Sequence, residues 1–118
     1  RQWLSAVKIL DTIKQYSQNL IKTMAGIQKK LILTTYNNLK SNGIMVYSTC
    51  SLEPEEDEDI IEFLLNETDA KLEKIPIRVK SEVNLDYKNY PSELKKSIKL
   101  WPQFYDTEGF FIAKIRKP

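Results

Sequence analysis

The residue best suited to covalent chemistry is Cys50, the single cysteine of the chain. It follows the apolar, β-prone run 44–49, and an acidic stretch starts soon after it at Pro54. Open α/β sheets place their working residues where a strand ends and a helix begins. Helix N-termini also stabilise negative charge, so this position favours the thiolate, the nucleophilic form of cysteine. The pattern therefore predicts a nucleophile at residue 50.

The acidic residues at 53–59 have the opposite effect if their side chains face the thiol, because nearby negative charge disfavours a thiolate. We expect them to point to solvent as first-turn acids of a helix. The cluster has neither the alternating ligand spacing nor the glycine of a calcium-binding loop, which favours a capped helix and predicts no metal site. The sequence has no histidine, so histidine bases and histidine metal ligands are excluded.

Composition limits the remaining possibilities. At 118 residues, 42% hydrophobic and 29% charged, the chain is predicted to form one folded domain. A net charge of +2 is too small to indicate a nucleic-acid surface by itself. A single cysteine cannot form an internal disulfide, so we expect a reducing, cytoplasmic setting. No signal peptide or membrane-spanning apolar run is apparent, and we expect no membrane partner. Because the first residue is Arg1, we also expect a piece of something longer.

Helical spacing dominates the first third of the chain. It predicts an amphipathic helix over 2–16, a break at 17–19 and a second helix over 20–39, ended by Gly43 in the left-handed cap position. The predicted core-facing residues of the second helix are Ile27, Leu31, Tyr36 and Leu39. The run 44–48 is apolar at most positions, which predicts a parallel strand covered on both faces.

The rest of the chain alternates helical and extended patterns. Pro54 fits the first position of a helix over 54–66, with a buried stripe formed by Ile60, Ile61, Phe63, Leu64 and Leu65. Residues 71–79 predict an edge strand or extended segment interrupted by Pro76, and 81–96 a loop with one helical turn at 92–96. Strands at 98–101 and 109–116 are predicted to pair as an antiparallel hairpin. This order predicts an α/β fold, the second half of a doubly wound sheet.

The segment Val46-Tyr47-Ser48-Thr49-Cys50-Ser51-Leu52, followed by Pro54-Glu55-Glu56-Asp57-Glu58, resembles the nucleophile motif of a known enzyme family. That family is the Sun/Fmu (NOL/NOP/Sun) group of S-adenosylmethionine-dependent RNA cytosine-5 methyltransferases. The segments 27–31, 39–40, 100–102 and 107–114 are similar to the family's preceding helix and closing strands.

The chain also departs from the family pattern. Asp57 stands where the family usually has Asn, and Gln103 where it often has His. The family's glycine-rich cofactor loop and its Asp-Ala-Pro-Cys motif, which carries a second cysteine, would precede Arg1. The resemblance therefore implies that residues 1–118 are the C-terminal part of the catalytic domain, a Rossmann-like half that ends in an antiparallel strand pair.

The resemblance also implies a mechanism, because C5 of cytosine is a poor nucleophile. In this family a cysteine thiolate adds to C6, which activates C5 toward the methyl sulfonium; loss of the C5 proton then expels the thiolate. Cys50 takes the part of that catalytic cysteine. S-adenosylmethionine is expected to be bound mainly by residues outside this chain. The implied partners are an RNA substrate, whose base must leave the stack, and the N-terminal half on the same or another chain.

Several alternatives stay open. A lone cysteine is often a small apolar core residue, and the chain could be a catalytically silent remnant that binds RNA or protein. A DNA cytosine methyltransferase is a weaker alternative, since those enzymes resemble a different Pro-Cys arrangement. Phe110 and Phe111 could stack a base but are expected in the strand core, as is Trp101. Whether transfer or ribosomal RNA is the substrate is left open.

Overall fold

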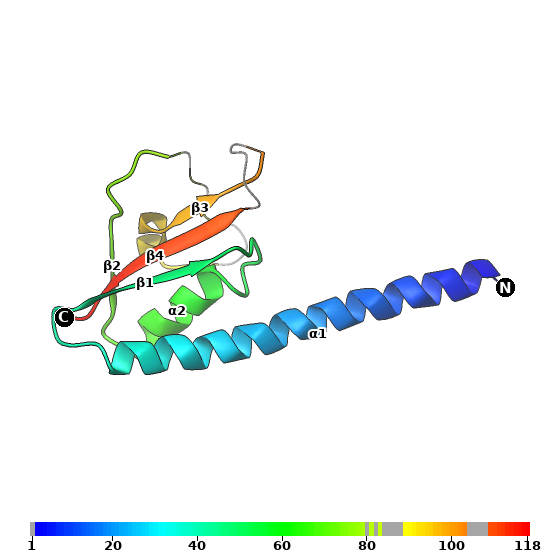
Figure 1. The fold of residues 1–118 in the computed structure, drawn as a ribbon, viewed down its shortest axis with the longest axis horizontal. Helices are drawn as coiled ribbons and strands as arrows, with labels where there is room; N and C mark the ends of the chain where they lie inside the picture. The colour runs from blue at the N-terminus through cyan, green and yellow to red at the C-terminus, as the bar shows by residue number, and fades with distance from the viewer. Residues whose placement is uncertain (1, 80, 82, 84–88, 104–108) are drawn as a thin grey trace.

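One four-stranded sheet with helices packed on one of its faces forms the body of the protein (Figure 1). The computed structural model describes residues 2–79, 81, 83, 89–103 and 109–118, with side chains from residue 18 onward. The elements in chain order are α1 (Gln2–Asn37), β1 (Ile44–Thr49), α2 (Glu58–Glu67), β2 (Lys71–Glu73), the 3₁₀ helix η1 (Ser92–Lys96), β3 (Ile98–Leu100) and β4 (Phe110–Arg116). Predicted positions before residue 18, and Thr107 and Glu108 of the family-like ending, lie outside the described side chains.

The last strand, β4, lies at the centre of the sheet. It pairs with β1 along one edge, from Ile44 opposite Arg116 to Thr49 opposite Phe111. Along its other edge it pairs with β2 and β3. All of these described pairings are antiparallel, so the predicted antiparallel pairing of the last two strands is confirmed, as is the edge position of β2.

The predicted parallel, doubly covered strand at 44–48 is wrong on both points. The described partner of β1 is antiparallel, and alternate residues of β1 are exposed, including Ile44 and Val46. Apolar residues on both faces of the strand suggested double burial, but helices of the described chain cover only one face. The fold is therefore mixed α/β with a mainly antiparallel sheet, and not a clear Rossmann half.

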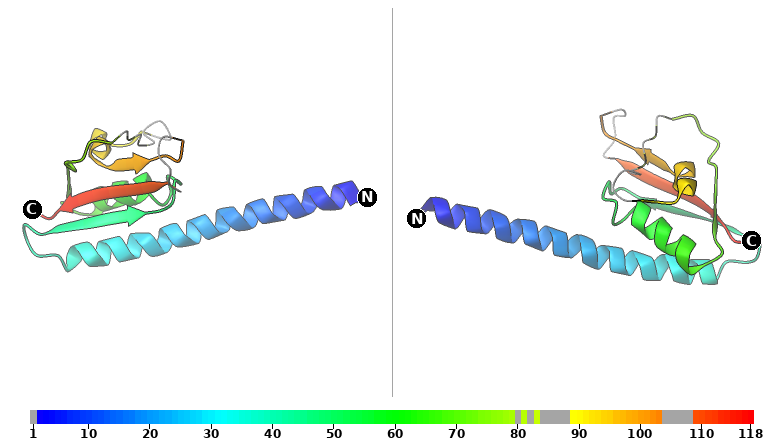
Figure 2. Two further views of the ribbon diagram at one scale, coloured as in Figure 1. Left: turned by 45° about the horizontal axis from the view of Figure 1, so that its top comes forward. Right: turned by 180° about the vertical axis from the view of Figure 1, so that it is seen from behind.

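Helix α1 is continuous and long. It runs through Ser17, Gln18 and Asn19, where a break was predicted; these residues are only mildly unfavourable in a helix, unlike glycine or proline. Its 36 residues span about 54 Å, and its N-terminal part projects past the sheet (Figures 1 and 2). Of its predicted core positions, Tyr36 is buried, whereas Ile27 and Leu31 are 47% and 61% exposed.

Helix α2 packs its apolar side chains into the same core as α1 and β4. It begins at Glu58 rather than Pro54, because residues 54–57 form hydrogen-bonded turns. The predicted apolar stripe is confirmed for Ile60, Ile61 and Leu64, which are fully buried in one core cluster with β4. Phe63 and Leu65, the other two predicted members, are half-buried against that cluster. The core also contains the buried α1 and β4 side chains Ala25, Ile32, Tyr36, Phe111, Ala113 and Ile115. No helix of the described chain is long and apolar enough to cross a bilayer.

The turn between α1 and β1 closes the far end of the sheet. Asn42, not Gly43, adopts the left-handed conformation there, with φ of 65°. Asn42 donates its backbone N–H to the carbonyl of Lys117, and Lys117 donates in turn to the carbonyl of Gly43. The start of β1 is therefore tied to the end of β4, and Cys50 lies at the opposite end of both strands.

Candidate functional site around Cys50

Cys50 follows directly after β1, and its side chain is exposed. The strand alternates, so that Met45, Tyr47 and Thr49 pack toward the core while Ile44 and Val46 lie on the exposed face. Cys50 therefore lies at the end of a strand and before a helix, as the sequence predicts. The thiol is accessible to a reagent from solvent.

The residues on both sides of Cys50 are hydrogen-bonded to the turn that precedes α2. Thr49 Oγ1 donates to Asp57 Oδ1 at 2.5 Å and lies 3.3 Å from the carbonyl oxygen of Ser51. Ser51 Oγ donates to Glu56 Oε2 at 2.6 Å and accepts the backbone N–H of Glu53 at 3.0 Å. These bonds hold the backbone around the thiol while leaving the thiol itself uncovered.

Tyr47 adds a third link between β1 and the same turn. Its hydroxyl donates to the carbonyl oxygen of Glu56 at 2.6 Å, and its ring meets Phe111 edge-on, with ring centroids 6.4 Å apart. Burial raises the pKa of Tyr47, and the carboxylates of Asp57 and Glu56 raise it further. The phenol therefore keeps its proton and remains a hydrogen-bond donor.

A cluster of three charged side chains is buried beneath this turn. Asp57, Glu58 and Lys99 each have 0% exposure. Lys99 Nζ donates to both Glu58 carboxylate oxygens, at 2.8 and 3.0 Å, and forms an ion pair with Asp57 Oδ2 at 3.2 Å. The expectation that all of these acids point to solvent is wrong for Asp57 and Glu58, because Lys99 of β3 supplies a buried counter-charge.

Burial and nearby charges shift the pKa of the Asp57 carboxyl. Burial raises the pKa of Asp57 to about 7, although the hydrogen bond from Thr49 and the charge of Lys99 both lower it. The nearby carboxylate of Glu58 raises it further. Asp57 also occupies the N-cap position of α2 without making a side-chain cap bond, since its carboxylate faces Thr49 and Lys99 instead.

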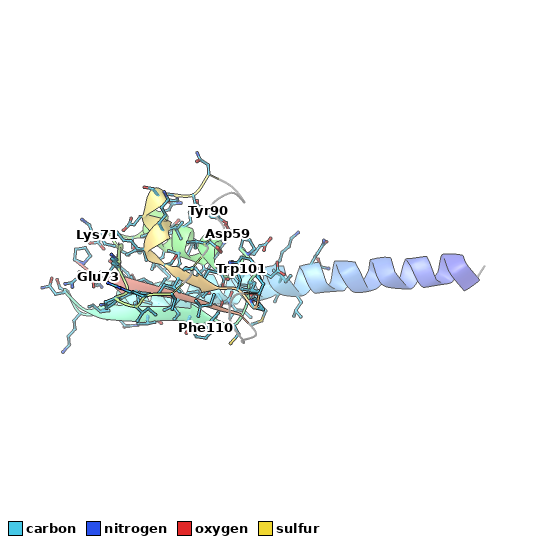
Figure 3. All side chains as sticks on the ribbon, turned by 90° about the horizontal axis from the view of Figure 1, so that it is seen from above. Asp59, Lys71, Glu73, Tyr90, Trp101 and Phe110 are labelled. Atoms are coloured by element: carbon cyan, nitrogen blue, oxygen red, sulfur yellow. The ribbon has the colours of Figure 1, made fainter. Side chains whose placement is uncertain are left out.

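Aromatic side chains gather at the same end of the sheet. The Lys99 ammonium lies 5.2 Å from the ring centre of Trp101 and 6.0 Å from that of Phe111. Figure 3 places Trp101 and Phe110 at this end, far from Lys71 and Glu73 at the other. Phe111 is buried in the core cluster, as expected. Phe110 is half-buried on the other face of β4, outside that cluster, so the expected core position is wrong for Phe110.

A shallow groove leads along β1 toward Cys50. It has a volume of about 350 Å³ and lies between α1 and β1; its lining residues are Gln28, Leu31, Ile32, Thr35 and Met45–Thr49. None of these side chains carries a charge, and no glycine-rich turn borders the groove. Its polar side chains, Gln28, Thr35, Ser48 and Thr49, could meet hydroxyl groups, but the lining has no charged partner for the amino-acid group of S-adenosylmethionine and so does not fit that cofactor. A larger cavity of about 530 Å³ lies elsewhere; its lining residues are Lys74, Ile75, Ile77, Val79, Ser81, Val83 and Lys95–Ile98.

No group of three or more Cys, Asp or Glu side chains suited to a metal ion occurs among the described residues. The acidic residues near Cys50 are instead occupied by Lys99, Thr49 and Ser51. Lys99 itself was not predicted. The sequence does contain a signal for its burial, because Lys99 stands between Ile98 and Leu100 on a short apolar strand. Its partner in the strand register, Phe111, faces the core.

The sequence matches the family model described as "16S rRNA methyltransferase RsmB/F" over residues 7–116, nearly the whole chain. The chain belongs to the RsmB/F family. This confirms the resemblance to RNA cytosine-5 methyltransferases. Members of this family are S-adenosylmethionine-dependent enzymes that act on RNA.

Individual relatives agree with this assignment. A tRNA (cytosine(49)-C(5))-methyltransferase of Pyrococcus abyssi is 47% identical over 95 residues, which cover 78% of this chain and 30% of the relative. A ribosomal RNA small subunit methyltransferase F of Psychromonas ingrahamii is 37% identical over 111 residues, which cover 89% of this chain and 21% of the relative. The crystal structure of a methyltransferase homologue from Pyrococcus horikoshii superposes with a TM-score of 0.79 at 39% identity, covering 85% of this chain and 33% of that structure. This RsmB/F-family chain thus spans between a fifth and a third of the length of these proteins.

Proposed function

We propose that this chain supplies the nucleophile-bearing part of an S-adenosylmethionine-dependent RNA cytosine-5 methyltransferase, with Cys50 as the covalent nucleophile. One observation carries the proposal: in a member of this family, the single thiol is exposed at the end of β1, between two residues hydrogen-bonded to the next turn. A fixed backbone around an uncovered nucleophile is the arrangement that covalent catalysis needs.

The chemistry assigned to Cys50 balances as follows. The Sγ thiolate forms a bond to C6 of cytosine, and the displaced π electrons make C5 nucleophilic. S-adenosylmethionine, held by chain outside these residues, would supply the methyl group to C5 and leave as S-adenosylhomocysteine. A base then removes the C5 proton, the C6–Sγ bond breaks, and the thiolate is released. The cytosine must be turned out of its stack to reach an exposed thiol at the end of a strand.

We further propose that residues 1–118 form the C-terminal part of a Rossmann-like catalytic domain. Both β1 and β2 are antiparallel to β4 and so run in the same direction, with α2 joining them as in a βαβ unit. The outer edge of β1 has no described partner strand and could continue the sheet. We assign cofactor binding to chain outside these residues, on the same or another polypeptide, and place the activity in the cytoplasm.

A chimeric enzyme tests the assignment of Cys50. The matched 95 residues of the Pyrococcus abyssi enzyme are replaced by the corresponding part of this chain, and the product is incubated with S-adenosylmethionine and RNA containing 5-fluorocytosine. We expect a covalent protein–RNA adduct, stable in denaturing gels, because fluorine at C5 blocks the release step. Cys50→Ala should abolish the adduct, while Lys71→Ala at the other end of the sheet should retain it.

The outcomes separate the proposal from its alternative. An adduct that persists in the Cys50→Ala chimera contradicts the role of Cys50. RNA binding by a folded chimera without any adduct favours the catalytically silent, RNA-binding reading. The names of the relatives mention transfer RNA in one case and ribosomal RNA in the other. Parallel reactions with each RNA, in which the transfer of a labelled methyl group is measured, decide between these two substrates.

A further inference from the structure

We propose that Lys99, Asp57 and Thr49 form a positioning chain that runs from the core to the backbone around Cys50 and fixes the direction of its thiol. Lys99 is a positioning residue in this proposal, since it acts on the nucleophile through two other side chains. The inference rests on the proposed function of Cys50, but its test below does not require catalysis.

The first step is the unusual burial of the charges. Three ionisable side chains with 0% exposure lie together in a domain of this size. Such clusters contribute little net stability, because the cost of removing the charges from water offsets their attraction. Replacing such a cluster by apolar side chains of similar volume is often neutral or stabilising. The cluster therefore points to a purpose other than stability.

The second step is the path from the cluster to the thiol. Lys99 Nζ lies 3.2 Å from Asp57 Oδ2, and the other oxygen of that carboxylate accepts the Thr49 hydroxyl at 2.5 Å. Thr49 immediately precedes Cys50, and its hydroxyl also lies 3.3 Å from the carbonyl of Ser51, which immediately follows. The single proton of the Thr49 hydroxyl goes to the shorter contact, Asp57, and this bond links Asp57 to the residue directly before Cys50.

The third step is that Lys99 is itself held in place. Its ammonium makes two hydrogen bonds to Glu58 and lies over the rings of Trp101 and Phe111. Asp57 makes no cap bond to α2, so Lys99 and Thr49 determine the orientation of its carboxylate. Supporting contacts of this kind are what holds a reactive group in a productive geometry.

Alkylation of Cys50 by iodoacetamide, followed by mass spectrometry of the intact 118-residue chain, tests the proposal. The reading is unambiguous because the chain has no other cysteine. We expect Thr49→Val, which removes only the hydroxyl, and Lys99→Met each to change the alkylation rate by about threefold or more, as for residues joined through one network of a hydrogen bond and an ion pair. Thr49→Ser and Lys99→Arg keep the required donors and should restore the rate to within about twofold of the unmodified chain.

The double variant Thr49→Val/Lys99→Met provides the decisive comparison. If both residues act through one path, its rate should change no more than that of the stronger single variant. Effects that multiply in the double variant, or an unchanged rate in a folded Thr49→Val chain, overturn the proposal. Glu73→Gln, which removes surface ion pairs with Lys114 and Arg116, is the matched control and should leave the rate unchanged.

Thermal unfolding followed by circular dichroism keeps the test interpretable. Alkylation is measured well below the unfolding midpoint of each variant, so that a local change around Cys50 is distinguished from global unfolding. If Lys99→Met does not fold, the Thr49→Val and Thr49→Ser pair still decides the outcome. Failure of the chimera to form an RNA adduct would count against the function of Cys50, whereas an unresponsive alkylation rate would count against the positioning chain alone.

Discussion

At the scale of single residues, the environment of Cys50 is governed by carboxyl groups that the fold has removed from water. Glu58 has Lys99 as a bidentate partner, whereas Asp57 shares that lysine and keeps one oxygen without a hydrogen bond. Lys99 therefore hydrogen-bonds both carboxylate oxygens of Glu58, whereas the carboxylate of Asp57 is only partly satisfied. The consequence is a proton-linked contribution to folding centred on Asp57.

We predict that Asp57 makes the chain less stable as the pH rises toward neutrality. Burial raises its pKa from 3.8 to about 7, so between these values the folded chain holds a proton that the unfolded chain has released. Stability from this group is therefore complete below about pH 4 and is lost as the pH rises through about 7; a pKa change of this size corresponds to about 4 kcal/mol.

Urea unfolding of the unmodified chain and of Asp57→Asn, at several pH values between about 4 and 8, measures this contribution. Asparagine can still accept the Thr49 hydroxyl but cannot titrate. The difference in unfolding free energy between the two proteins should change with pH in favour of Asp57→Asn as the pH rises. A difference that stays constant over this range would show that Asp57 has an ordinary pKa.

A second residue-scale prediction concerns Tyr47. Tyr47→Phe removes the hydroxyl that donates to Glu56 but keeps the edge-on ring contact with Phe111. Losing one hydrogen bond to a partly buried carbonyl should cost about 1 kcal/mol of unfolding free energy, measured by urea titration. An equally stable Tyr47→Phe chain would mean that water replaces the hydroxyl at Glu56.

At the scale of elements, the sequence predicts those features that depend on neighbouring residues. The α2 stripe, the turn at Ser92–Lys96 and the antiparallel β3–β4 pair all follow from local periodicity and turn chemistry. The orientation of β1 relative to its partner does not, because β4 lies more than 60 residues further along the chain. The Glu58–Lys99 pair, 41 residues apart, could not be predicted for the same reason.

The α1 discrepancy has a different physical origin. Ser17, Gln18 and Asn19 were interpreted as a break because polar residues interrupt the apolar spacing, yet none of them removes a backbone donor or requires a special conformation. For Ile27 and Leu31, helical spacing alone cannot indicate which of two apolar stripes meets the core. The structure selects the stripe of Ala25, Ile32 and Tyr36.

Two glycines allow an element-scale prediction with an internal control. Gly109 precedes β4 with φ of +109°, and an added Cβ would lie 2.9 Å from the side chain of Leu52, two residues after Cys50. Gly109→Ala should destabilise the chain by about 1–3 kcal/mol. Gly26→Ala, in α1 with nothing within 4 Å, should instead stabilise it by about 0.5–1 kcal/mol. Thermal unfolding of both variants checks the signs, and equal effects at the two sites would contradict the argument.

At the scale of the whole molecule, the shape is extended and much apolar surface is exposed. The radius of gyration is 16.9 Å, against about 13.5 Å for a compact chain of this length, because α1 projects beyond the sheet (Figure 2). Along α1, exposed apolar residues recur at helical spacing: Leu20, Met24, Ile27 and Leu31. Val46, 62% exposed on β1, extends the apolar surface. Patches of this kind mark contact surfaces.

We therefore predict that the isolated chain associates, with itself or with another polypeptide. Sedimentation analysis should show a concentration-dependent increase in mass, and Leu31→Lys combined with Val46→Lys should shift the chain toward the monomer. Ile77→Lys, at an exposed apolar position outside this surface, is the control and should not. A clean monomer at all concentrations would contradict the prediction.

The central position of β4 has a consequence for synthesis. All three of its partner strands precede it in the chain, and each pairs with β4 in the described sheet rather than with another of the three. Until residues 110–116 have left the ribosome, β1, β2 and β3 lack the strand with which each of them pairs here, and α2 lacks the core side chains of β4. These pairings must therefore wait for β4, and apolar side chains of the earlier elements stay uncovered until it arrives.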